Sequence, residues 1–204
     1  MNKTVASISN IVDKLRDEKE YLLVAIDGRC ASGKTSIALE LKDIYGCNVI
    51  HMDHFFLREE QRTGERLNAV GENIDHERFL DEVLLPLRSG KSFSYRPYNC
   101  GLHQFDEPIF IEPKAINIIE GSYSCHDKLY EYYDMRIFLS VESDEQFRRI
   151  VRRNGVDKAT VFKEKWIPME EQYFSLLSIY DRCEYCFTTE QSGQVRINSL
   201  NPSI

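Results

Sequence analysis

The feature that most constrains the fold is an apolar run followed at once by a glycine-containing loop, in residues 21–35. The run YLLVAID is almost continuously apolar, which is typical of a strand buried on both faces. The loop reads GRCASGKT and has the pattern G-x-x-x-x-G-K-T. Gly28 and Gly33 let the backbone turn tightly, and a helix that begins near Lys34 adds the positive end of its dipole. This stretch, the phosphate loop, predicts a site for a di- or triphosphate.

The phosphate loop has a predicted role for its backbone and for two of its side chains. Backbone N–H groups surround the phosphates, and Lys34 reaches the terminal phosphates as a point charge. The Thr35 hydroxyl takes one position on a Mg²⁺ ion. The residues expected to bind the nucleotide are Gly28, Arg29, Cys30, Ala31, Ser32, Gly33, Lys34, Thr35 and Ser36.

Charge and length narrow the class of partner. The 204 residues carry 33 Asp and Glu against 26 Lys and Arg, a formal net charge of -7. This balance opposes binding to nucleic acid or to an anionic membrane, so we expect a small-molecule substrate. The length favours a single domain over 1–204 and leaves a homo-oligomer open.

Cysteine usage and hydropathy predict a cytoplasmic location. The six cysteines follow no secretory spacing, and the N-terminus lacks a charged region followed by an apolar one. No apolar run approaches the ~18 residues of a membrane span. We therefore expect reduced thiols, no signal peptide and no membrane segment.

Apolar periodicity predicts helices and strands that alternate around a parallel sheet. An amphipathic helix is expected over 4–18, and a polar excursion over the site at 57–75. Further buried strands are expected at 47–52, 115–120, 135–141 and 185–188, helices at 35–45, 79–87, near 126–132, from 143 and from 160, and a rim hairpin from 93–98 and 109–111. The fold class predicted is an α/β three-layer sandwich.

Two carboxylates follow predicted strands at the sheet edge where open α/β folds bind ligands. Transfer of a phosphoryl group to a hydroxyl needs a second Mg²⁺ anchor and a carboxylate that faces the acceptor O–H. Glu120 can hold the metal, with a carboxylate at a helix N-terminus as the alternative. Asp53 can accept the acceptor's proton or orient that hydroxyl, with an N-cap for the turn at Phe55 as the alternative.

The order of motifs resembles the uridine kinase family of P-loop nucleoside kinases. The stretches are GRCASGKT, MDHFF, NIDHERF, RPYNCGLH, IIEGSY and SDEQFRRIVRRN, and together they cover most of residues 20–190. The resemblance implies a P-loop NTPase fold, ATP and Mg²⁺ as cofactors, and phosphorylation of the 5′-hydroxyl of uridine or a related nucleoside. It implies Asp53 as catalytic base and neighbour of the metal, and Glu120 as the residue that completes the Mg²⁺ site.

The same resemblance implies the residues that hold the acceptor. Asp75 corresponds to the family's ribose-binding aspartate, although an N-cap for the next helix explains it as well. Tyr98 and His103 correspond to the nucleobase contacts, with ordinary rim residues as the alternative. The chain departs from the family at Ile74 and Cys100, where relatives carry stacking aromatic residues. These departures put the base-stacking slot in question.

A helical lid over about 148–165 is expected to cover the phosphates. Arg149 and Arg152 are candidates for nucleotide binding and Arg153 for catalysis, against the alternative of a solvated helix face. The family's second arginine pair is absent, and VDKATVFKEK offers lysines only. Two other functions stay open: a kinase for another hydroxyl acceptor, such as pantothenate or another riboside, and a non-catalytic nucleotide-binding regulatory module.

Overall fold

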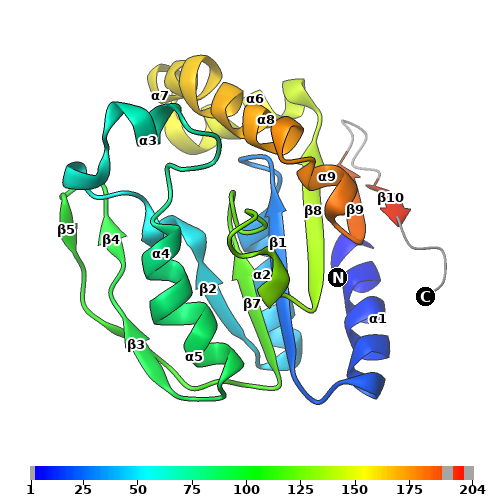
Figure 1. Cartoon of the computed structure of the whole chain (residues 1–204). Helices are drawn as coiled ribbons and strands as arrows, with labels where there is room; N and C mark the ends of the chain where they lie inside the picture. Colours follow the sequence, from blue (N-terminus) through cyan, green and yellow to red (C-terminus); the bar gives the residue numbers. More distant parts are fainter. Residues whose placement is uncertain (1–2, 190–194, 200–204) are drawn as a thin grey trace.

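The computed structural model describes residues 3–189 and 195–199. Within these residues, six strands form one sheet in the order β10-β9-β8-β1-β7-β2, parallel except for the terminal pair β9 and β10 (Figure 1). The strands are β1 (Leu22–Gly28), β2 (Asn48–His51), β7 (Ile116–Glu120), β8 (Met135–Val141), β9 (Tyr185–Thr189) and β10 (Val195–Ser199). The expected α/β fold with a central parallel sheet is confirmed.

Helices cover both faces of the sheet because alternate residues of each strand point to opposite sides. On one face, Leu22 and Val24 pack with helices α1 (Lys3–Glu18) and α2 (Lys34–Tyr45). On the other face, Leu23 and Ala25 pack with α4 (His76–Phe79), α5 (Leu85–Arg88), α8 (Ile167–Leu176) and α9 (Ile179–Arg182). Two apolar cores separated by the sheet therefore fix the strand register, since a one-residue shift would exchange them.

The excursion after β2 and the hairpin region at the rim are built from short helical turns and short strands. The excursion contains the 3₁₀ turns η1 (Met52–Phe55) and η2 (Glu59–Gln61) and helix α3 (Gly64–Asn68). At the rim, β3 (Phe93–Tyr95) pairs antiparallel with β6 (Ile109–Ile111), and β4 (Tyr98–Asn99) pairs with β5 (Gln104–Phe105) between them. The expected rim hairpin is thus a pair of short ribbons.

The helix expected near 126–132 is wrong. The segment is a series of turns that ends in the 3₁₀ turn η4 (Tyr130–Tyr132). Its preceding loop folds over the buried Asp27, whose carboxylate accepts hydrogen bonds from the backbone N–H groups of Tyr123 and Cys125 at 3.2 and 2.8 Å. Tyr123 also adopts a positive φ of 75°. These hydrogen bonds tie the loop before the segment to the end of β1.

Two predicted helices contain a π-helical segment just before or around a proline. The segment η3 (Leu80–Leu84) joins α4 to α5, which carries Pro86, and η5 (Phe162–Trp166) precedes α8, which carries Pro168. Proline has no N–H and its ring clashes with the carbonyl four residues earlier, so a wider turn accommodates it.

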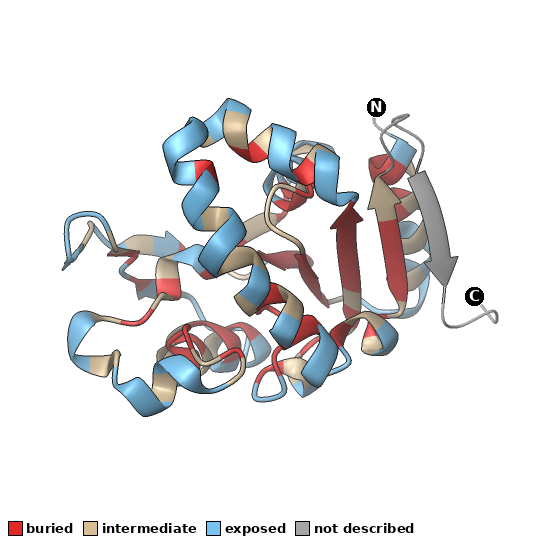
Figure 2. Ribbon diagram, turned by 90° about the horizontal axis from the view of Figure 1, so that it is seen from above, coloured by how far each residue is buried: buried red, intermediate tan, exposed pale blue. Residues whose placement is uncertain are grey.

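Helices α6 (Ser143–Asn154), α7 (Val156–Val161) and α8 lie across the carboxyl ends of the central strands (Figure 1). Seen from above, these helices present much exposed surface, whereas the strands beneath them are buried (Figure 2). In the described part of the chain, no helix combines the length and apolarity needed to cross a membrane.

Candidate active site

A large cleft opens at the carboxyl ends of the strands, beneath α6 to α8. Its volume is about 1720 Å³, which exceeds the ~300–1,000 Å³ of a typical site for one small ligand. Its wall comes from four parts of the chain: the phosphate loop, the ends of β2 and β7, the excursion at 57–75, and the helices above. The cleft therefore has room for a nucleotide and a second small molecule.

The phosphate loop has the backbone geometry that its glycines predict. Gly28 has a φ of 134° and Gly33 a φ of 102°, and Ala31 between them also has a positive φ of 60°. The Lys34 ammonium donates to the carbonyl oxygens of Gly28 at 2.7 Å and Arg29 at 2.9 Å. These bonds hold the lysine against the loop at the floor of the cleft.

A carboxylate and a hydroxyl meet beside the loop. The Thr35 hydroxyl lies 3.1 and 3.2 Å from the two carboxylate oxygens of Glu120. Strand register explains the meeting, because Glu120 at the end of β7 pairs with Ile26 of β1 and with His51 of β2. The hydroxyl and carboxylate oxygens are hard ligands of the kind that Mg²⁺ prefers. The residues present therefore fit a magnesium site.

His51 is a neighbour of this carboxylate that the sequence analysis did not single out. Its Nδ1 lies 2.5 Å from Glu120 Oε1, and this hydrogen bond raises the pKa of the imidazole against the effect of burial. A histidine fixed to a metal-binding carboxylate orients it. Its position at the end of β2, two residues before Asp53, is the sequence signal that could have identified it.

Asp53 lies in the wall of the same cleft, just beyond β2. Its carboxylate is exposed to the cleft, yet protein surrounds it on its other sides, and this burial raises the pKa of the group above its usual range while Lys34 lowers it. Glu120 also raises the Asp53 pKa through like-charge repulsion. Lys34, Thr35, Asp53 and Glu120 are thus brought to one end of the cleft.

The Arg29 side chain turns away from the cleft to brace the loop. Its guanidinium binds both carboxylate oxygens of Glu171 on α8, at 2.6 and 2.9 Å, and also donates to the Val141 carbonyl. Next to it, the Cys30 N–H donates to Glu170 at 2.8 Å, and Ser122 donates to the same carboxylate at 2.7 Å. The Arg29 side chain thus ties the phosphate loop to α8 and β8, and among the residues described Arg29 is absent from the cleft wall. Glu170 carries no sequence signal that distinguishes it from other acidic helix residues.

The lid arginines differ in their surroundings. Arg149 donates to the Ala31 carbonyl of the phosphate loop at 3.1 Å and to Glu145 at 2.7 Å. Arg152 and Arg153 line the cleft from α6, and Arg153 also donates to Asn154. Lys165 of η5 reaches the same cleft. The lid thus supplies several cations above the phosphate loop.

Of the residues that the resemblance implies for binding the acceptor, some line the cleft and others lie outside its wall. His103 lines the cleft, and so does Cys100. Asp75 is buried at 3% exposure, caps α4 through the Arg78 N–H at 3.1 Å and accepts from Gln61 at 2.7 Å. Tyr98 is buried against Phe105. Asp75 and Tyr98 are absent from the cleft wall among the residues described, so the contacts of Asp75 are those of the N-cap alternative.

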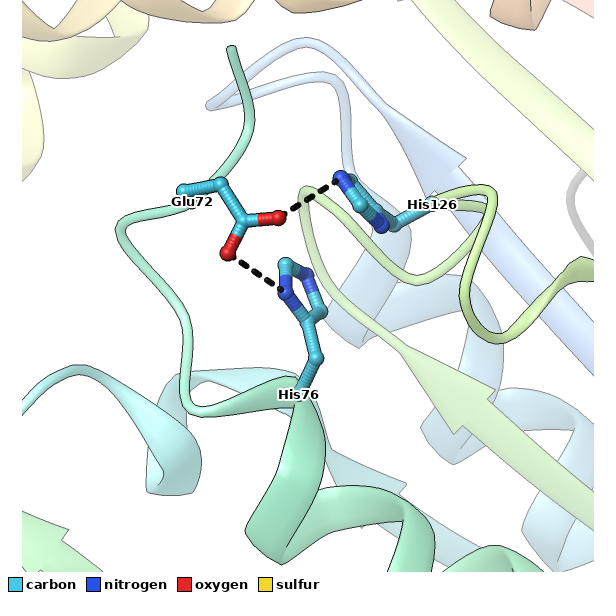
Figure 3. Close-up of side chains that lie close together, drawn as sticks. All are labelled: Glu72, His76 and His126. Atoms are coloured by element: carbon cyan, nitrogen blue, oxygen red, sulfur yellow. Dashed lines mark ion pairs between the residues drawn. The ribbon is translucent and has the colours of Figure 1, made fainter. Parts of the chain in front are cut away.

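A polar cluster beside the cleft anchors the end of the excursion (Figure 3). The Glu72 carboxylate faces His76 and His126, each at 3.8 Å, and Lys128 lies 2.6 Å from it. The two imidazole rings stack with centroids 4.0 Å apart. Parallel rings cannot both direct an in-plane lone pair at one ion, and Lys128 already neutralises the carboxylate. We therefore interpret the cluster as a structural anchor rather than a metal site.

Comparisons with known proteins place these features in a family. A sequence model of the phosphoribulokinase/uridine kinase family matches residues 23–161. The uridine kinase of Clostridium perfringens is 29% identical over 145 residues, covering 66% of this chain and 69% of that protein. The uridine kinase of Halalkalibacterium halodurans is 30% identical over 148 residues, covering 66% and 68%.

Solved structures share the fold at low sequence identity. A candidate fructose transport system kinase from a Silicibacter species has a TM-score of 0.64 at 21% identity, covering 85% of this chain and 93% of that chain. A possible uridine kinase from Bacillus stearothermophilus has a TM-score of 0.52 at 16% identity, covering 81% and 96%. Because the family model spans more than half of the residues and includes the phosphate loop, Asp53 and Glu120, this chain belongs to the phosphoribulokinase/uridine kinase family.

Proposed function

We propose that this protein is an ATP- and Mg²⁺-dependent kinase that phosphorylates a hydroxyl group of a small molecule. The observation that carries the proposal is the meeting of Lys34, Thr35, Glu120 and Asp53 at one end of a cleft with room for two ligands. A nucleotide-binding switch also needs Lys34, Thr35 and Glu120, because these residues bind the phosphates and the metal. A carboxylate open to the remaining space, as Asp53 is, serves proton transfer from an acceptor.

In the proposed mechanism, the phosphate loop and Lys34 hold the ATP phosphates, and Thr35 and Glu120, with Asp53 beside them, hold Mg²⁺. The ion, when bound, neutralises charge on the phosphates. Asp53 orients the acceptor hydroxyl and accepts its proton as the hydroxyl oxygen attacks the γ-phosphorus, while the bond from the γ-phosphorus to the β–γ bridging oxygen breaks and ADP leaves with that oxygen. Arg149 and Arg152 bind the nucleotide phosphates, and Arg153 is the cation proposed to stabilise charge on the transferring group.

The acceptor class suggested by the relatives is a nucleoside 5′-hydroxyl, with uridine first, and His103 is its proposed contact. Another hydroxyl acceptor is favoured by one observation. Cys100 occupies a cleft position where the family carries an aromatic residue, and Ile74 is fully buried. A missing aromatic platform costs ~1–3 kcal/mol of stacking, which is about ten- to a hundredfold in affinity. We therefore expect a uridine KM near or above the upper end of the ordinary ~1 μM to 1 mM range.

The reaction is proposed to take place in the cytoplasm. All six cysteines are free thiols, which supports a reducing compartment. ATP and Mg²⁺ are both abundant there.

The experiment that tests the proposed function is a scan of nucleosides and other hydroxyl compounds for ADP release above the rate without acceptor. We expect at least one acceptor to raise ADP release, and Lys34→Ala to abolish the increase, because the loop then loses its lysine at the terminal phosphates. A switch would release ADP slowly at a rate that no acceptor changes. Retained wild-type turnover in Lys34→Ala would contradict the kinase assignment.

A further inference from the structure

One arginine of the excursion at 57–75 differs from the other arginines of that segment in having no carboxylate partner. Arg62 is half-buried and lines the cleft, while its Nε donates to the Leu57 carbonyl at 3.0 Å. Its Nη2 lies 3.8 Å from the Cys100 sulfur. Over the described residues, no ion pair involves Arg62, whereas Arg58 and Arg66 in the same excursion each pair with glutamates. The Arg62 guanidinium therefore keeps donors directed at the space beside Cys100.

A second polar group with unused hydrogen-bonding capacity lines the cleft. Asn73 is only 7% exposed, and its Oδ1 has no hydrogen-bond partner among the described residues. Its backbone carbonyl accepts from the Leu57 N–H at 3.2 Å, and the Leu57 carbonyl accepts from Arg62, so Leu57 joins the two segments, while the Asn73 side chain itself interacts with Tyr123. A buried amide oxygen without a partner costs about 1–3 kcal/mol. A ligand O–H or N–H at this position would satisfy it.

The other charged groups near the space beside Cys100 do not cancel the positive charge of Arg62. Burial raises the pKa of the Cys100 thiol, Arg62 lowers this pKa, and Asp53 raises it by less than Arg62 lowers it. His103 is paired with Glu59 at 3.5 Å, and both side chains are exposed. The acidic groups Glu120 and Glu170 belong to the magnesium and phosphate-loop end of the cleft. The part lined by Leu57, Arg62 and Cys100 is thus suited to an anion.

We propose that the phosphoryl acceptor carries an anionic group, a carboxylate or a phosphate, that binds Arg62 beside Cys100 while its hydroxyl faces Asp53. The inference rests on the proposed function and names the substrate class for that site. A guanidinium matches the planar carboxylate and the phosphate through two parallel N–H donors, in a charge-assisted pair that a neutral nucleoside cannot form. The acceptor therefore differs from a neutral nucleoside in charge, and Asn73 binds one of its hydroxyl or amine donors.

The anion preference can be measured without any kinase activity. In the experiment, Cys100 is alkylated with iodoacetate, which is anionic, and with iodoacetamide, which is neutral, and peptide mass spectrometry gives the rate at this cysteine. The thiolate displaces iodide from either reagent, so the ratio of rates cancels the thiol's own reactivity. We expect Arg62→Gln to lower the iodoacetate-to-iodoacetamide ratio about fivefold, the factor for ~1 kcal/mol between charges near 4 Å in water.

Arg16→Gln is the matched control, since it removes the same charge from an exposed position on α1. Its ratio should equal that of the wild type. An unchanged ratio in Arg62→Gln, or an equal fall in both variants, would overturn the anion site.

Matched acceptors test the substrate class itself. Uridine is compared with orotidine, which adds a carboxylate, and glycerol with glycerol 3-phosphate, which keeps two free hydroxyls, so the two pairs separate the two anions. We expect the anionic member of one pair to have the higher kcat/KM, and Arg62→Gln to reduce it about tenfold or more while changing the neutral member little. Equal effects on both members, or preference for the neutral one, would contradict the proposal. If no compound is phosphorylated, the proposed function fails for these acceptors, and the alkylation ratio alone decides the anion site.

Discussion

The most direct structural prediction concerns two glycines of the phosphate loop that differ in one respect. Both have positive φ, 134° for Gly28 and 102° for Gly33. A Cβ on Gly28 would lie 1.9 Å from the carbonyl oxygen of Leu139 in the adjacent strand, whereas a Cβ on Gly33 would meet nothing within 4 Å. Gly28→Ala and Gly33→Ala therefore share backbone strain, but only the first adds a collision with backbone.

The magnitudes follow from these contacts. An alanine in such a conformation costs ~1–3 kcal/mol. For Gly28→Ala the strand must also move, since Cβ contacts under 3.0 Å are essentially never found. Leu139 pairs with Gly28 in the sheet and accepts the Arg29 N–H at 3.0 Å, so the movement weakens neighbouring hydrogen bonds at ~1 kcal/mol each. We expect a loss of about 4 kcal/mol or more for Gly28→Ala.

Urea unfolding followed by circular dichroism, with thermal melts, measures both variants. At ~2–4 °C per kcal/mol for a chain of this size, Gly28→Ala should lower Tm by roughly 8 °C or more, and by at least twice the effect of Gly33→Ala. Equal destabilisation by the two variants would refute the argument from the Leu139 contact. A Gly28→Ala protein as stable as the wild type would show that β8 does not approach the loop as described.

Three further predictions concern titratable groups. Asp53→Asn should lower kcat ~10²-fold with little change in MgATP affinity. Because burial raises the Asp53 pKa, the wild-type kcat should begin to fall, as the pH decreases, at a pH above the usual range of aspartate pKa values. The kcat of the variant should lack this decrease. Burial raises the pKa of Asp27 to about 6, so the contribution of the protonated carboxyl to the free energy of unfolding is complete below pH ~4 and is lost as the pH rises through 6. In urea unfolding from pH 4 to 7, the wild type should lose about 3 kcal/mol of unfolding free energy relative to Asp27→Asn. His51→Gln should raise the Mg²⁺ concentration for half-maximal rate ~10-fold, with kcat at saturating Mg²⁺ nearly unchanged, because Glu120 loses its orienting partner.

The sequence predicts most of the sheet and the floor of the cleft, for physical reasons. A strand buried on both faces must be apolar along its length, so β1 and β7 stand out as short runs. The glycines of the phosphate loop are needed by its backbone, and Asp53 and Glu120 follow strands whose ends share one edge. These inferences depend on local pattern and on the geometry of parallel sheets.

What the sequence does not predict depends on contacts between distant segments. Asp27 looks like the last residue of a strand, yet it organises the loop after β7 and accepts the Tyr173 hydroxyl of α8 at 2.8 Å. Asp75 points to a helix terminus rather than the cleft, because the direction of a side chain follows from packing and not from its motif. The pairing of Arg62 with Cys100 joins the excursion to the rim, and neither residue signals it alone.

The measurement that tests the central claim most directly is the appearance of a phosphorylated acceptor. The wild-type protein, MgATP and the acceptors of the scan are incubated together, and mass spectrometry quantifies ADP and the phosphorylated compound, with Lys34→Ala as the control. The account predicts that one acceptor gains a phosphoryl group in equal amount to the ADP formed, and that the control forms neither above background. ADP formed at the same rate without acceptor, with no phosphorylated compound, would contradict it.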